Sequence, residues 1–589
     1  MIRYFNRLTS VAALLFTVAF LLPTFVSAQT APTFSRIIVF GDSLSDTGNV
    51  RDRTNSKSGG TVDYPSNTFN YSDGRFTNSS DTDPASSTYV GVWHEQLART
   101  FLSLPEATYS LGGGTNYAFG GATTENGTSD RVATSTPFFG DVTITIDNLG
   151  KQLDDYLAAR VVDPNALYVV WGGGNDLFDD DTAANVTATA GRVTALVSRL
   201  ANAGAKHIMV PNVPPLGEIP KYSNDTAEME SLNAASANYR SELNAALTSR
   251  LSFLASQGVT PTVYRLDVWK NTIRIFSDPE KYGFTDLSNS SQGRSGVNPD
   301  EFLFWDDIHP TTAAHYQTAK GAYDALTIPP TPPAKAANIS TRVGVDTGER
   351  VSIAGFIVTG DTPKKVLIRG IGPSLSEKSV PNPLADPMLT LFDGAGTARI
   401  TNDDWKHSQQ AEIMATGIPP TSDLESAIVA TLAPGRYTAV LASKNGGTGI
   451  GLVEVYDLEP GTSSSLGNVS TRGFVGTGDN IIIGGLIIGN GDSPIVVLRA
   501  IGPTLLNSGI GNPLLDPTLE LHDGNGALLG FNDNWKNGQA QAVLATELGP
   551  LDDRESALVA FLTPGNYTAV VRGKGDTTGV ALVEAYRVP

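Results

Sequence analysis

Three side chains that lie far apart in the sequence have the types and local spacing needed for nucleophilic catalysis. Ser43 stands in the tetrapeptide Gly41-Asp42-Ser43-Leu44, directly after the apolar run 36–40. A serine hydroxyl becomes an effective nucleophile only when a neighbouring base accepts its proton. His309 is the candidate base, because Asp306 lies three residues earlier and can fold back on a tight turn to hold the Nδ1 proton. These residues predict a serine nucleophile activated by a histidine.

Each of these residues also has an ordinary structural interpretation. Gly, Asp and Ser are common in turns and helix caps, so the tetrapeptide alone is equally typical of a turn. His315 is the competing histidine, but it lies inside an expected helix over 311–326 with no acid in an equivalent place. Asp307 is the alternative carboxylate to Asp306. We expect His315 to be a surface or packing residue, as we do the remaining histidines: His94, His207, His407 and His522.

Two glycine-rich segments contain groups that could stabilise a developing negative charge. Gly172-Gly173-Gly174-Asn175-Asp176 ends the apolar run 168–171, so the Asn175 amide is a candidate donor. In the second segment, 112–122, a free backbone N–H at Gly121 could supply another donor, since glycines let the backbone approach a substrate closely. Either segment alone is equally interpreted as a turn.

The elements around these residues predict an α/β fold. Apolar, β-rich runs read as buried strands over 36–40, 166–171, 207–211 and 262–266. Between them, apolar residues recur at helical spacing, as in Val193, Leu196, Val197 and Leu200. Continuous apolar strands alternating with helices indicate a parallel sheet covered on both faces. Ligands bind outside the carboxyl ends of such strands, which is where Ser43 is expected.

Together the four segments, in this order, resemble the GDSL family of the SGNH hydrolase superfamily over residues 29–328. The resemblance implies a three-layer α/β/α flavodoxin-like domain with a parallel sheet. It implies Ser43 as the nucleophile, His309 as the base and Asp306 as the acid that orients the base. The implied oxyanion donors are the backbone N–H groups of Ser43 and Gly121 and the side chain of Asn175.

Two further segments, 74–78 (Gly-Arg-Phe-Thr-Asn) and 304–315, are most similar to the lipase, phospholipase and hemolysin branch of that family. The chain departs from the family pattern between Asn78 and Trp93, where it inserts a polar segment near the expected acyl site. That segment contains Asp81, Asp83 and Pro84. No G-x-S-x-G, H-E-x-x-H or G-x-x-x-x-G-K-[ST] pattern occurs. The sequence signals neither a catalytic metal nor a nucleotide, so we expect no cofactor.

The composition narrows the class of protein further. A chain of 589 residues exceeds one domain of roughly 100–200 residues, so several domains are expected. The 41 Lys and Arg against 60 Asp and Glu give a formal net charge of -19, which disfavours nucleic-acid partners. The chain has no cysteine, which excludes disulfides, thiolate zinc sites and a cysteine nucleophile.

The first 28 residues are typical of a signal peptide. Arg3 and Arg7 precede the apolar run 11–25, and the small-residue stretch that follows ends at Ala28, after which we expect cleavage. The alternative is an uncleaved membrane anchor, but Pro23 interrupts a run already shorter than the about 20 apolar residues that a spanning helix needs. We therefore expect a secreted protein, extracellular or periplasmic, with no transmembrane segment in the mature chain.

The second half of the chain is a tandem repeat. Asn338-Ile339-Ser340-Thr341-Arg342 aligns with Asn468-Val469-Ser470-Thr471-Arg472, an offset of 130 residues. Short alternating strand patterns between turn residues predict an all-β sandwich with its own core in each copy. The expected boundaries are a hydrolase domain over 29–328, a proline-rich linker over 329–337, the first repeat over 338–458, a second linker over 459–467 and the second repeat over 468–589.

Both repeats resemble the bacterial pre-peptidase C-terminal modules appended to secreted hydrolases. Acidic residues in them could hold calcium, although turns built from Asp, Asn and Gly are the simpler interpretation: Asp393, Asp403, Asp404, Asp523 and Asp533. Trp405 and Trp535 could stack on sugars or pack in the core. We expect adhesion, targeting or stabilising modules, with a polysaccharide or cell-surface partner as the hypothesis.

These observations lead to one main hypothesis and two alternatives. The main hypothesis is a secreted serine esterase or lipase that acts on an ester substrate, either an acyl lipid or an acetylated carbohydrate. One alternative is a carbohydrate acetyl esterase, since the same superfamily deacetylates plant polysaccharides. The other is a surface-binding protein whose hydrolase domain is inactive, against which the intact set of Ser43, Asp306 and His309 argues.

Overall fold

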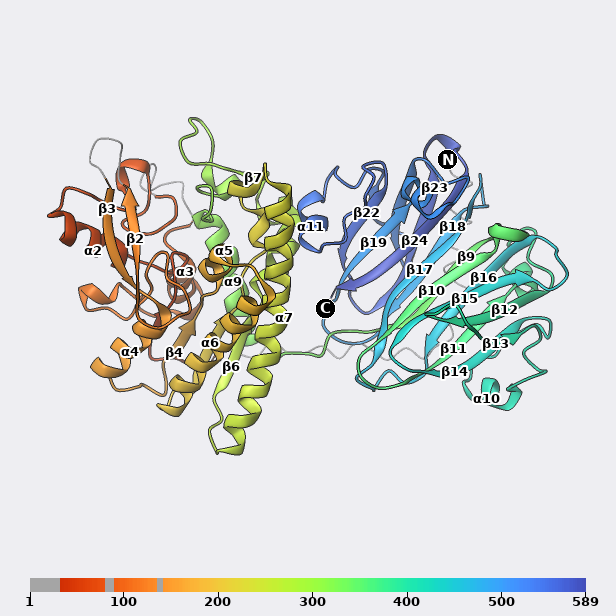
Figure 1. Cartoon of the computed structure of the whole chain (residues 1–589), viewed down its shortest axis with the longest axis horizontal. Coiled ribbons are helices and arrows are strands. Elements are labelled where there is room, and N and C mark those ends of the chain that lie inside the picture. Colours follow the sequence, from red (N-terminus) through yellow and green to blue (C-terminus); the bar gives the residue numbers. More distant parts are fainter. Residues whose placement is uncertain (1–31, 80–88, 135–140, 589) are drawn as a thin grey trace. The chain divides into compact units, whose positions relative to one another are not determined.

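The computed structural model describes residues 32–79, 89–134 and 141–588 of the chain. The expected signal peptide, 1–28, and the inserted Asp81, Asp83 and Pro84 lie outside these ranges. The chain divides into two compact units, with the boundary between Pro330 and Thr331 (Figure 1). No helix in the described ranges combines the length and the apolar character that crossing a bilayer requires.

A parallel sheet lies at the centre of the first unit. Its order is β1-β4-β5-β6, and its strands are β1 (Ile37–Phe40), β4 (Leu167–Val170), β5 (His207–Pro211) and β6 (Thr262–Leu266). All four predicted strands are confirmed, with ends that differ by at most one residue. A further extended segment runs parallel to the other edge of β1, where Val39 N donates to Thr115 O at 3.1 Å and Tyr117 N to Val39 O at 2.8 Å. The strand order therefore reverses at β1, as in flavodoxin-like sheets.

Helices cover both faces of this sheet, which makes the unit a three-layer α/β/α domain. Alternate strand residues point to opposite faces. Val39 and Val169 pack in one apolar cluster with Trp93 of α3 (Trp93–Gln96) and with α9 (Thr312–Thr327). On the other face, the Phe40 ring lies 5.6 Å from that of Tyr156 in α4 (Leu149–Ala159). The fold class expected from the sequence is confirmed.

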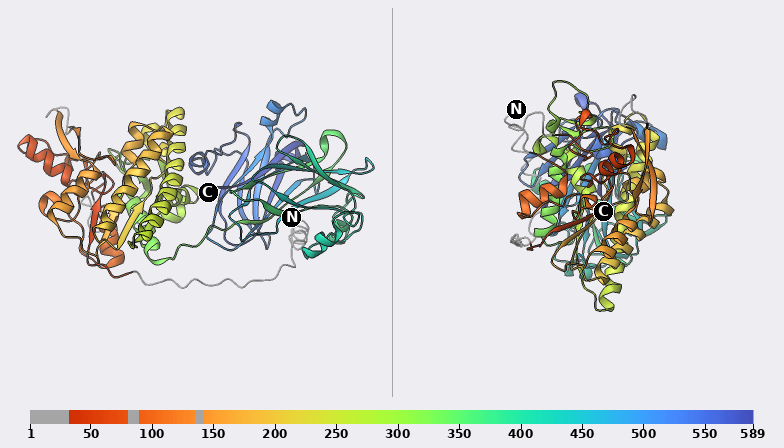
Figure 2. Two further views of the ribbon diagram at one scale, coloured as in Figure 1. Left: turned by 60° about the horizontal axis from the view of Figure 1, so that its bottom comes forward. Right: turned by 90° about the vertical axis from the view of Figure 1, so that its left-hand side faces the viewer.

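The helical patterns in the sequence correspond to long helices in this unit. The run around Val193 belongs to α6 (Ala183–Asn202), beside which runs α7 (Thr226–Ser256), and Figure 2 shows α7 as the longest helix of the unit. The side chains of Thr182 and Thr311 cap α6 and α9 by accepting a backbone N–H in the first turn. The remaining α-helices are α2 (Asn49–Ser58), α5 (Gly174–Asp179) and α8 (Val268–Ser277). Two short strand pairs complete the unit: β2 (Thr128–Thr134) with β3 (Asp141–Asp147), and β7 (Asp286–Ser290) with β8 (Phe302–Phe304).

The second unit is a large, mainly antiparallel β-region in which the two repeats have matching elements (Figure 1). The first repeat comprises β9 (Ala336–Val345), β10 (Ser352–Thr359), β11 (Lys364–Ile371), β12 (Pro387–Asp393), β13 (Ala398–Asn402), α10 (Gln410–Ala415), β14 (Ser426–Leu432), β15 (Gly435–Ser443) and β16 (Gly449–Asp457). The second comprises β17 (Ser465–Val475), β18 (Ile482–Ile488), β19 (Ile495–Ile501), β20 (Pro517–Asp523), β21 (Leu528–Asn532), α11 (Ala540–Ala545), β22 (Ser556–Phe561), β23 (Gly565–Gly573) and β24 (Gly579–Val588).

The first strand of each repeat pairs with strands of both repeats. β9 lies between β16 of its own repeat and β18 of the other, and β17 lies between β24 and β10. Thr341 and Thr471, which are equivalent residues of the two repeats, share a buried Oγ1–Oγ1 hydrogen bond of 2.8 Å. The repeats are thus related by an approximate two-fold axis near this bond. We expected each repeat to have a core of its own. Instead, Val343 of the first repeat packs in the core of the second, and Leu466 of β17 packs in the core of the first.

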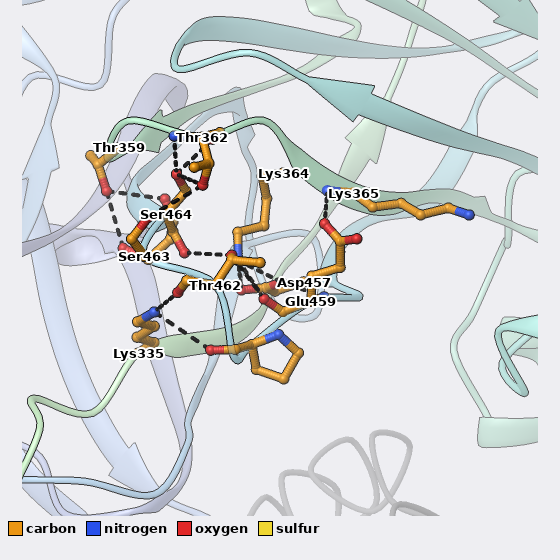
Figure 3. Close-up of polar contacts among 12 residues, drawn as sticks. Lys335, Thr359, Thr362, Lys364, Lys365, Asp457, Glu459, Thr462, Ser463 and Ser464 are labelled. Carbon is orange, nitrogen blue, oxygen red and sulfur yellow. Dashed lines mark hydrogen bonds and ion pairs between the residues drawn. The ribbon is translucent and has the colours of Figure 1, made fainter.

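The segment expected as a linker over 459–467 makes many polar contacts with the first repeat. β17 begins at Ser465, inside that range, and the residues before it are bound to the first repeat (Figure 3). The Lys364 ammonium donates to Asp457 Oδ2 at 2.9 Å and to Glu459 O at 2.7 Å, and both side chains of this ion pair are fully buried. Ser464 Oγ donates to Thr362 O at 2.6 Å. The connection is therefore fixed by polar contacts.

The acidic and aromatic residues singled out in the repeats have structural partners. Asp393 Oδ1 accepts the backbone N–H groups of its own turn, at Ala395 and Thr397, and Asp523 does the same in the second repeat. Lys444 lies 2.6 Å from Asp403, and Lys574 lies 2.8 Å from Asp533. Trp405 and Trp535 are each 5% exposed, so both rings pack in the interior and are not available to stack on sugars.

The buried ion pair generates a prediction about stability. Asp457→Asn leaves the Lys364 ammonium buried without a charged partner, so the free energy of unfolding of the β-region should fall by about 3–5 kcal/mol in urea denaturation. Glu412→Gln is the matched control, because Glu412 pairs with the neighbouring Lys365 on the surface and should cost less than about 1 kcal/mol. Equal effects of the two substitutions would contradict this account of the connection.

Candidate active site

Ser43 lies on a tight turn at the carboxyl end of β1. Asp42 forms this turn, since its Oδ1 accepts Leu44 N at 3.0 Å and its carbonyl accepts Ser45 N at 3.0 Å. Gln152 holds the residue before the turn, accepting Gly41 N at 2.9 Å and donating to Gly41 O at 2.8 Å. The Ser43 N–H has no acceptor among the residues that the structure describes, so it is available to a substrate.

The structure brings Ser43, His309 and Asp306 together. Ser43 Oγ lies 2.9 Å from His309 Nε2, and His309 Nδ1 lies 2.8 Å from Asp306 Oδ2. The other carboxylate oxygen, Oδ1, accepts the backbone N–H groups of Ile308 at 2.8 Å and His309 at 2.7 Å. One aspartate therefore both closes the turn that carries the histidine and holds the imidazole, as the three-residue spacing predicts.

The electrostatics of this turn keep Asp306 ionised. Burial raises the pKa of a carboxyl group, but the His309 charge and the hydrogen bonds from the turn outweigh it and lower the pKa of Asp306 to about 2. The lowered pKa stabilises the folded protein above pH 3.8, and this contribution is lost as the pH falls from 3.8 to about 2. The ionised carboxylate is an acceptor for a proton on His309 Nδ1, and the tautomer with this proton presents the Nε2 lone pair to Ser43.

Tyr71 is a fourth member of this hydrogen-bonded chain that the sequence analysis missed. Its hydroxyl donates to Asp306 Oδ2 at 2.7 Å, the same oxygen that His309 Nδ1 contacts. The ring packs edge-on against Trp305, with centroids 6.1 Å apart. Tyr71 and Asp306 are separated by 235 positions, and no local pattern around Tyr71 signals their contact.

The segment 74–78 fastens the histidine turn to the rest of the domain. Thr77 Oγ1 donates to Pro310 O at 2.9 Å, and the Asn78 side chain forms hydrogen bonds of 3.0 and 2.7 Å with Thr312 at the start of α9. The Phe76 ring lies 5.0 Å from the His309 ring. The family resemblance of this segment thus has a structural counterpart, because it holds Pro310 and Thr312, which follow His309.

The predicted oxyanion donors line the same cavity as Ser43. Asp46 Oδ2 accepts Gly120 N at 2.9 Å and Asn175 Nδ2 donates to Ala122 O at 2.9 Å, so both ends of the Gly120–Ala122 turn are held. The N–H of Gly121 has no acceptor in the described part of the chain. One hydrogen of the Asn175 amide is used by Ala122, which leaves the other for a ligand.

A buried ionic network joins the two glycine-rich segments. Asp176 accepts the backbone N–H of Thr124 at 2.9 Å and its hydroxyl at 2.6 Å. Arg192 of α6 donates to Asp176 Oδ1 at 3.0 Å and to the Thr124 hydroxyl at 2.7 Å. The sequence analysis included Asp176 in the motif without a role. Its role is structural, because it fixes the segment after Gly121 against the segment that carries Asn175.

Ser43, Gly121, Asn175 and His309 line one cavity of about 330 Å³. Its walls are mainly aliphatic and aromatic, with contributions from α8, α9 and the β2–β3 hairpin: Val50, Phe76, Ile144, Phe178, Leu216, Ile219, Val268, Ile275, Phe276, Leu303 and Phe304. Burial raises the pKa of Asp42, which also lines the cavity, to about 7. A mainly apolar cavity next to a nucleophile suits a substrate with an apolar arm.

His315, the competing histidine, is a packing residue. It is 1% exposed, and its Nδ1 accepts the backbone N–H of Trp93 at 3.3 Å. Burial lowers its pKa to about 3, so the ring is neutral at physiological pH. The other carboxylate considered, Asp307, accepts Ser290 Oγ at 3.4 Å through its side chain, and its carbonyl accepts Lys221 N. The imidazole of His309 contacts Asp306.

Comparisons with known proteins point to one family for the first unit. The profile of the family described as GDSL-like Lipase/Acylhydrolase matches residues 37–322. The chain is 25% identical over 342 residues to a phosphatidylcholine-sterol acyltransferase from Aeromonas hydrophila, covering 50% of this chain and 90% of that protein. It is 26% identical to GDSL esterase/lipase 6 of Arabidopsis thaliana, covering 53% of this chain and 92% of that protein.

A solved structure of a lipolytic G-D-S-L family protein from Veillonella parvula covers 49% of this chain at 13% identity, with a TM-score of 0.25. The match of the family profile, together with the α/β/α fold, defines the class of the first unit. Residues 37–322 are thus similar to a domain of the GDSL-like lipase/acylhydrolase family.

The position of Asp306 generates the first prediction for this site. Asp306→Asn should lower kcat for an ester substrate by about 10³- to 10⁴-fold, because the amide no longer holds the Nδ1–H tautomer of His309. Asp307→Asn is the matched control and should retain activity within about twofold of the unmodified chain. If Asp307→Asn were the damaging substitution, the orienting carboxylate would have been misassigned.

The Tyr71 contact generates a second prediction. Tyr71→Phe removes one hydrogen bond to the Asp306 carboxylate while keeping the ring, so kcat should fall by about tenfold, equivalent to one charge-assisted hydrogen bond. KM should stay nearly constant, since the hydroxyl is bound to Asp306. Steady-state kinetics on a soluble ester measures both constants, and an unchanged kcat would show that the hydroxyl does not act through Asp306.

Proposed function

We propose that the first unit is a serine hydrolase of carboxylic esters, with Ser43 as nucleophile, His309 as base and Asp306 as the acid that orients it. The observation that carries the proposal is the hydrogen-bonded chain from Ser43 Oγ through both nitrogens of His309 to Asp306 Oδ2, at 2.9 and 2.8 Å. A hydroxyl, an imidazole and a buried carboxylate in this order are the arrangement that activates serine. The family of residues 37–322 supports the same reaction class.

In the proposed mechanism, Ser43 Oγ attacks the ester carbonyl carbon while His309 Nε2 takes the hydroxyl proton. The carbonyl oxygen becomes an oxyanion and accepts hydrogen bonds from the N–H groups of Ser43 and Gly121 and from Asn175 Nδ2, each contributing ~3 kcal/mol in the transition state. The intermediate collapses as His309 donates its proton to the leaving alcohol, leaving an acyl group on Ser43. Water then repeats the two steps and releases the acid.

The walls of the cavity support an acyl lipid as the substrate rather than an acetylated carbohydrate. A sugar ester needs several polar partners, whereas the residues around Ser43 are mostly aliphatic and aromatic. Val132 and Ile308, which also line the cavity, are 57% and 36% exposed. The buried Trp405 and Trp535 remove one argument for a sugar partner. Carbohydrate acetyl esterase therefore remains the second choice.

The proposal extends to location and to the repeats. Export through the signal peptide 1–28 would bring the enzyme to lipid esters outside the cytoplasm, and the β-region would serve as an accessory binding or targeting module. A polysaccharide or cell-surface partner can be tested by pull-down of the exported chain with cell envelope or insoluble polysaccharide. Retention by neither would reduce the repeats to a structural role.

The central prediction of this proposal concerns Ser43 and His309. Ser43→Ala and His309→Ala should each lower kcat by about 10⁴-fold or more, with the melting temperature nearly unchanged, because both residues lie at the cavity wall. A fluorophosphonate probe should label the unmodified chain at Ser43 and should not label Ser43→Ala. Absence of labelling in the unmodified chain would favour the alternative of an inactive, surface-binding protein.

The choice of substrate is tested by a panel of short- and long-chain p-nitrophenyl esters, phospholipid and acetylated xylan. Long-chain esters should have the higher kcat/KM, since the apolar walls bind the alkyl arm. Highest activity on acetylated xylan would replace the lipid hypothesis with that of a carbohydrate acetyl esterase.

A further inference from the structure

The turn that carries the Gly121 N–H is held at nearly every peptide group. Gly120 N donates to Asp46, Ala122 N donates to Phe119 O at 3.1 Å, and Ala122 O accepts from Asn175. The carbonyl of Gly121 is bound as well, by Arg131. Within the described ranges, the N–H of Gly121 is left as the uncommitted donor of this turn.

Arg131 reaches the turn from β2. Its Nε and Nη2 donate to Gly121 O at 3.2 and 3.0 Å, so two N–H groups on one edge of the planar guanidinium converge on a single carbonyl oxygen. Asp179 lies 3.7 Å from Nη2. The Arg131 side chain is 36% exposed and lines the same cavity as Ser43. A lysine could not reproduce this contact, because its ammonium is a single point donor.

We infer that Arg131 is a positioning residue that holds the Gly121 N–H in its place as an oxyanion donor. This inference rests on the proposed function and assigns a residue that the triad and the donors themselves do not include. Gly121 has a φ of +81°. Glycine has little intrinsic preference for this conformation over its alternatives. Binding its carbonyl fixes the peptide after Gly121, while the Asp46 contact fixes the residue before it. The guanidinium therefore supplies the restraint that glycine itself lacks.

The close packing of the two residues supports the same inference. A Cβ added to Gly121 would lie 3.0 Å from Arg131 Nε, so the guanidinium lies against the glycine backbone itself. An oxyanion donor acts only when it is aimed at the place where charge develops, and loss of one donor costs about 10²- to 10³-fold in kcat. Loosening the donor should cost part of that factor.

Two substitutions separate the geometry of the contact from its charge. Arg131→Lys keeps the positive charge and removes the paired N–H donors, whereas Arg131→Gln removes both. Both should lower kcat on a soluble p-nitrophenyl ester by about 10- to 100-fold with KM changed less than about threefold, because the donor acts in the transition state. The affinity for a trifluoromethyl ketone, which forms an oxyanion on Ser43, should fall by the same factor as kcat. Normal kcat in Arg131→Lys would mean that positive charge alone suffices and would overturn the positioning role.

Arg53→Gln is the matched control. Arg53 also binds the β2–β3 hairpin, donating to Thr145 O at 2.7 Å and to Asp147 at 3.1 Å. Its guanidinium packs over the Phe119 ring next to the Gly120–Ala122 turn, 4.4 Å from the ring centroid, but donates no hydrogen bond to the turn, so it tests packing without the carbonyl contact. Its kcat should stay within about twofold of the unmodified chain. If Arg53→Gln lowered kcat as much as Arg131→Gln does, the effect would belong to the hairpin as a whole, and the inference would be overturned.

A second measurement reads the geometry without relying on turnover. Hydrogen–deuterium exchange of peptides that span 119–124 should become faster in Arg131→Gln and stay unchanged in Arg53→Gln, since loss of the carbonyl contact frees the turn. Unaltered exchange and unaltered kcat in Arg131→Gln would each overturn the inference. An unmodified chain that neither turns over esters nor reacts at Ser43 would instead overturn the proposed function, and exchange would still test the position of the turn.

Discussion

The hydrogen bond between Ser43 Oγ and His309 Nε2 joins two turns that are 266 positions apart, and much of the surrounding polar structure keeps those turns in place. Gln152 of α4 holds the turn that carries Ser43, and the segment 74–78 holds the turn that carries His309 through Pro310 and Thr312. Buried polar groups are costly when unpaired and directional when paired. Hydrogen bonds can therefore define the distance between Ser43 and His309 more sharply than apolar packing alone.

The same principle governs the oxyanion side of the site. Asp176 and Arg192 join the two glycine-rich segments through charged hydrogen bonds, so the N–H of Gly121 and the amide of Asn175 are held relative to each other. The apolar cavity next to these donors lowers the local dielectric, which strengthens their interaction with a developing charge.

In the second unit, the repeat in the sequence becomes an approximate two-fold relation in space, centred near the Thr341–Thr471 hydrogen bond. Because β9 and β17 each pair with strands of both repeats, the two copies share sheets and are held as one body. The symmetry is broken at the connection between them. The buried Lys364–Asp457 pair of the first repeat corresponds, 130 residues later, to Pro494 and Arg587.

The sequence by itself determined the four parallel strands, the helices around Val193 and after Thr311, and the local relation of Asp306 to His309. These features depend on hydrophobic periodicity, turn chemistry and the spacing of near neighbours, all of which can be read from the order of residues. Only the tertiary structure decided that Tyr71 meets Asp306, that Arg131 meets Gly121, and that the repeats exchange strands. Such contacts join residues whose neighbours give no sign of them, because they arise from how whole elements pack.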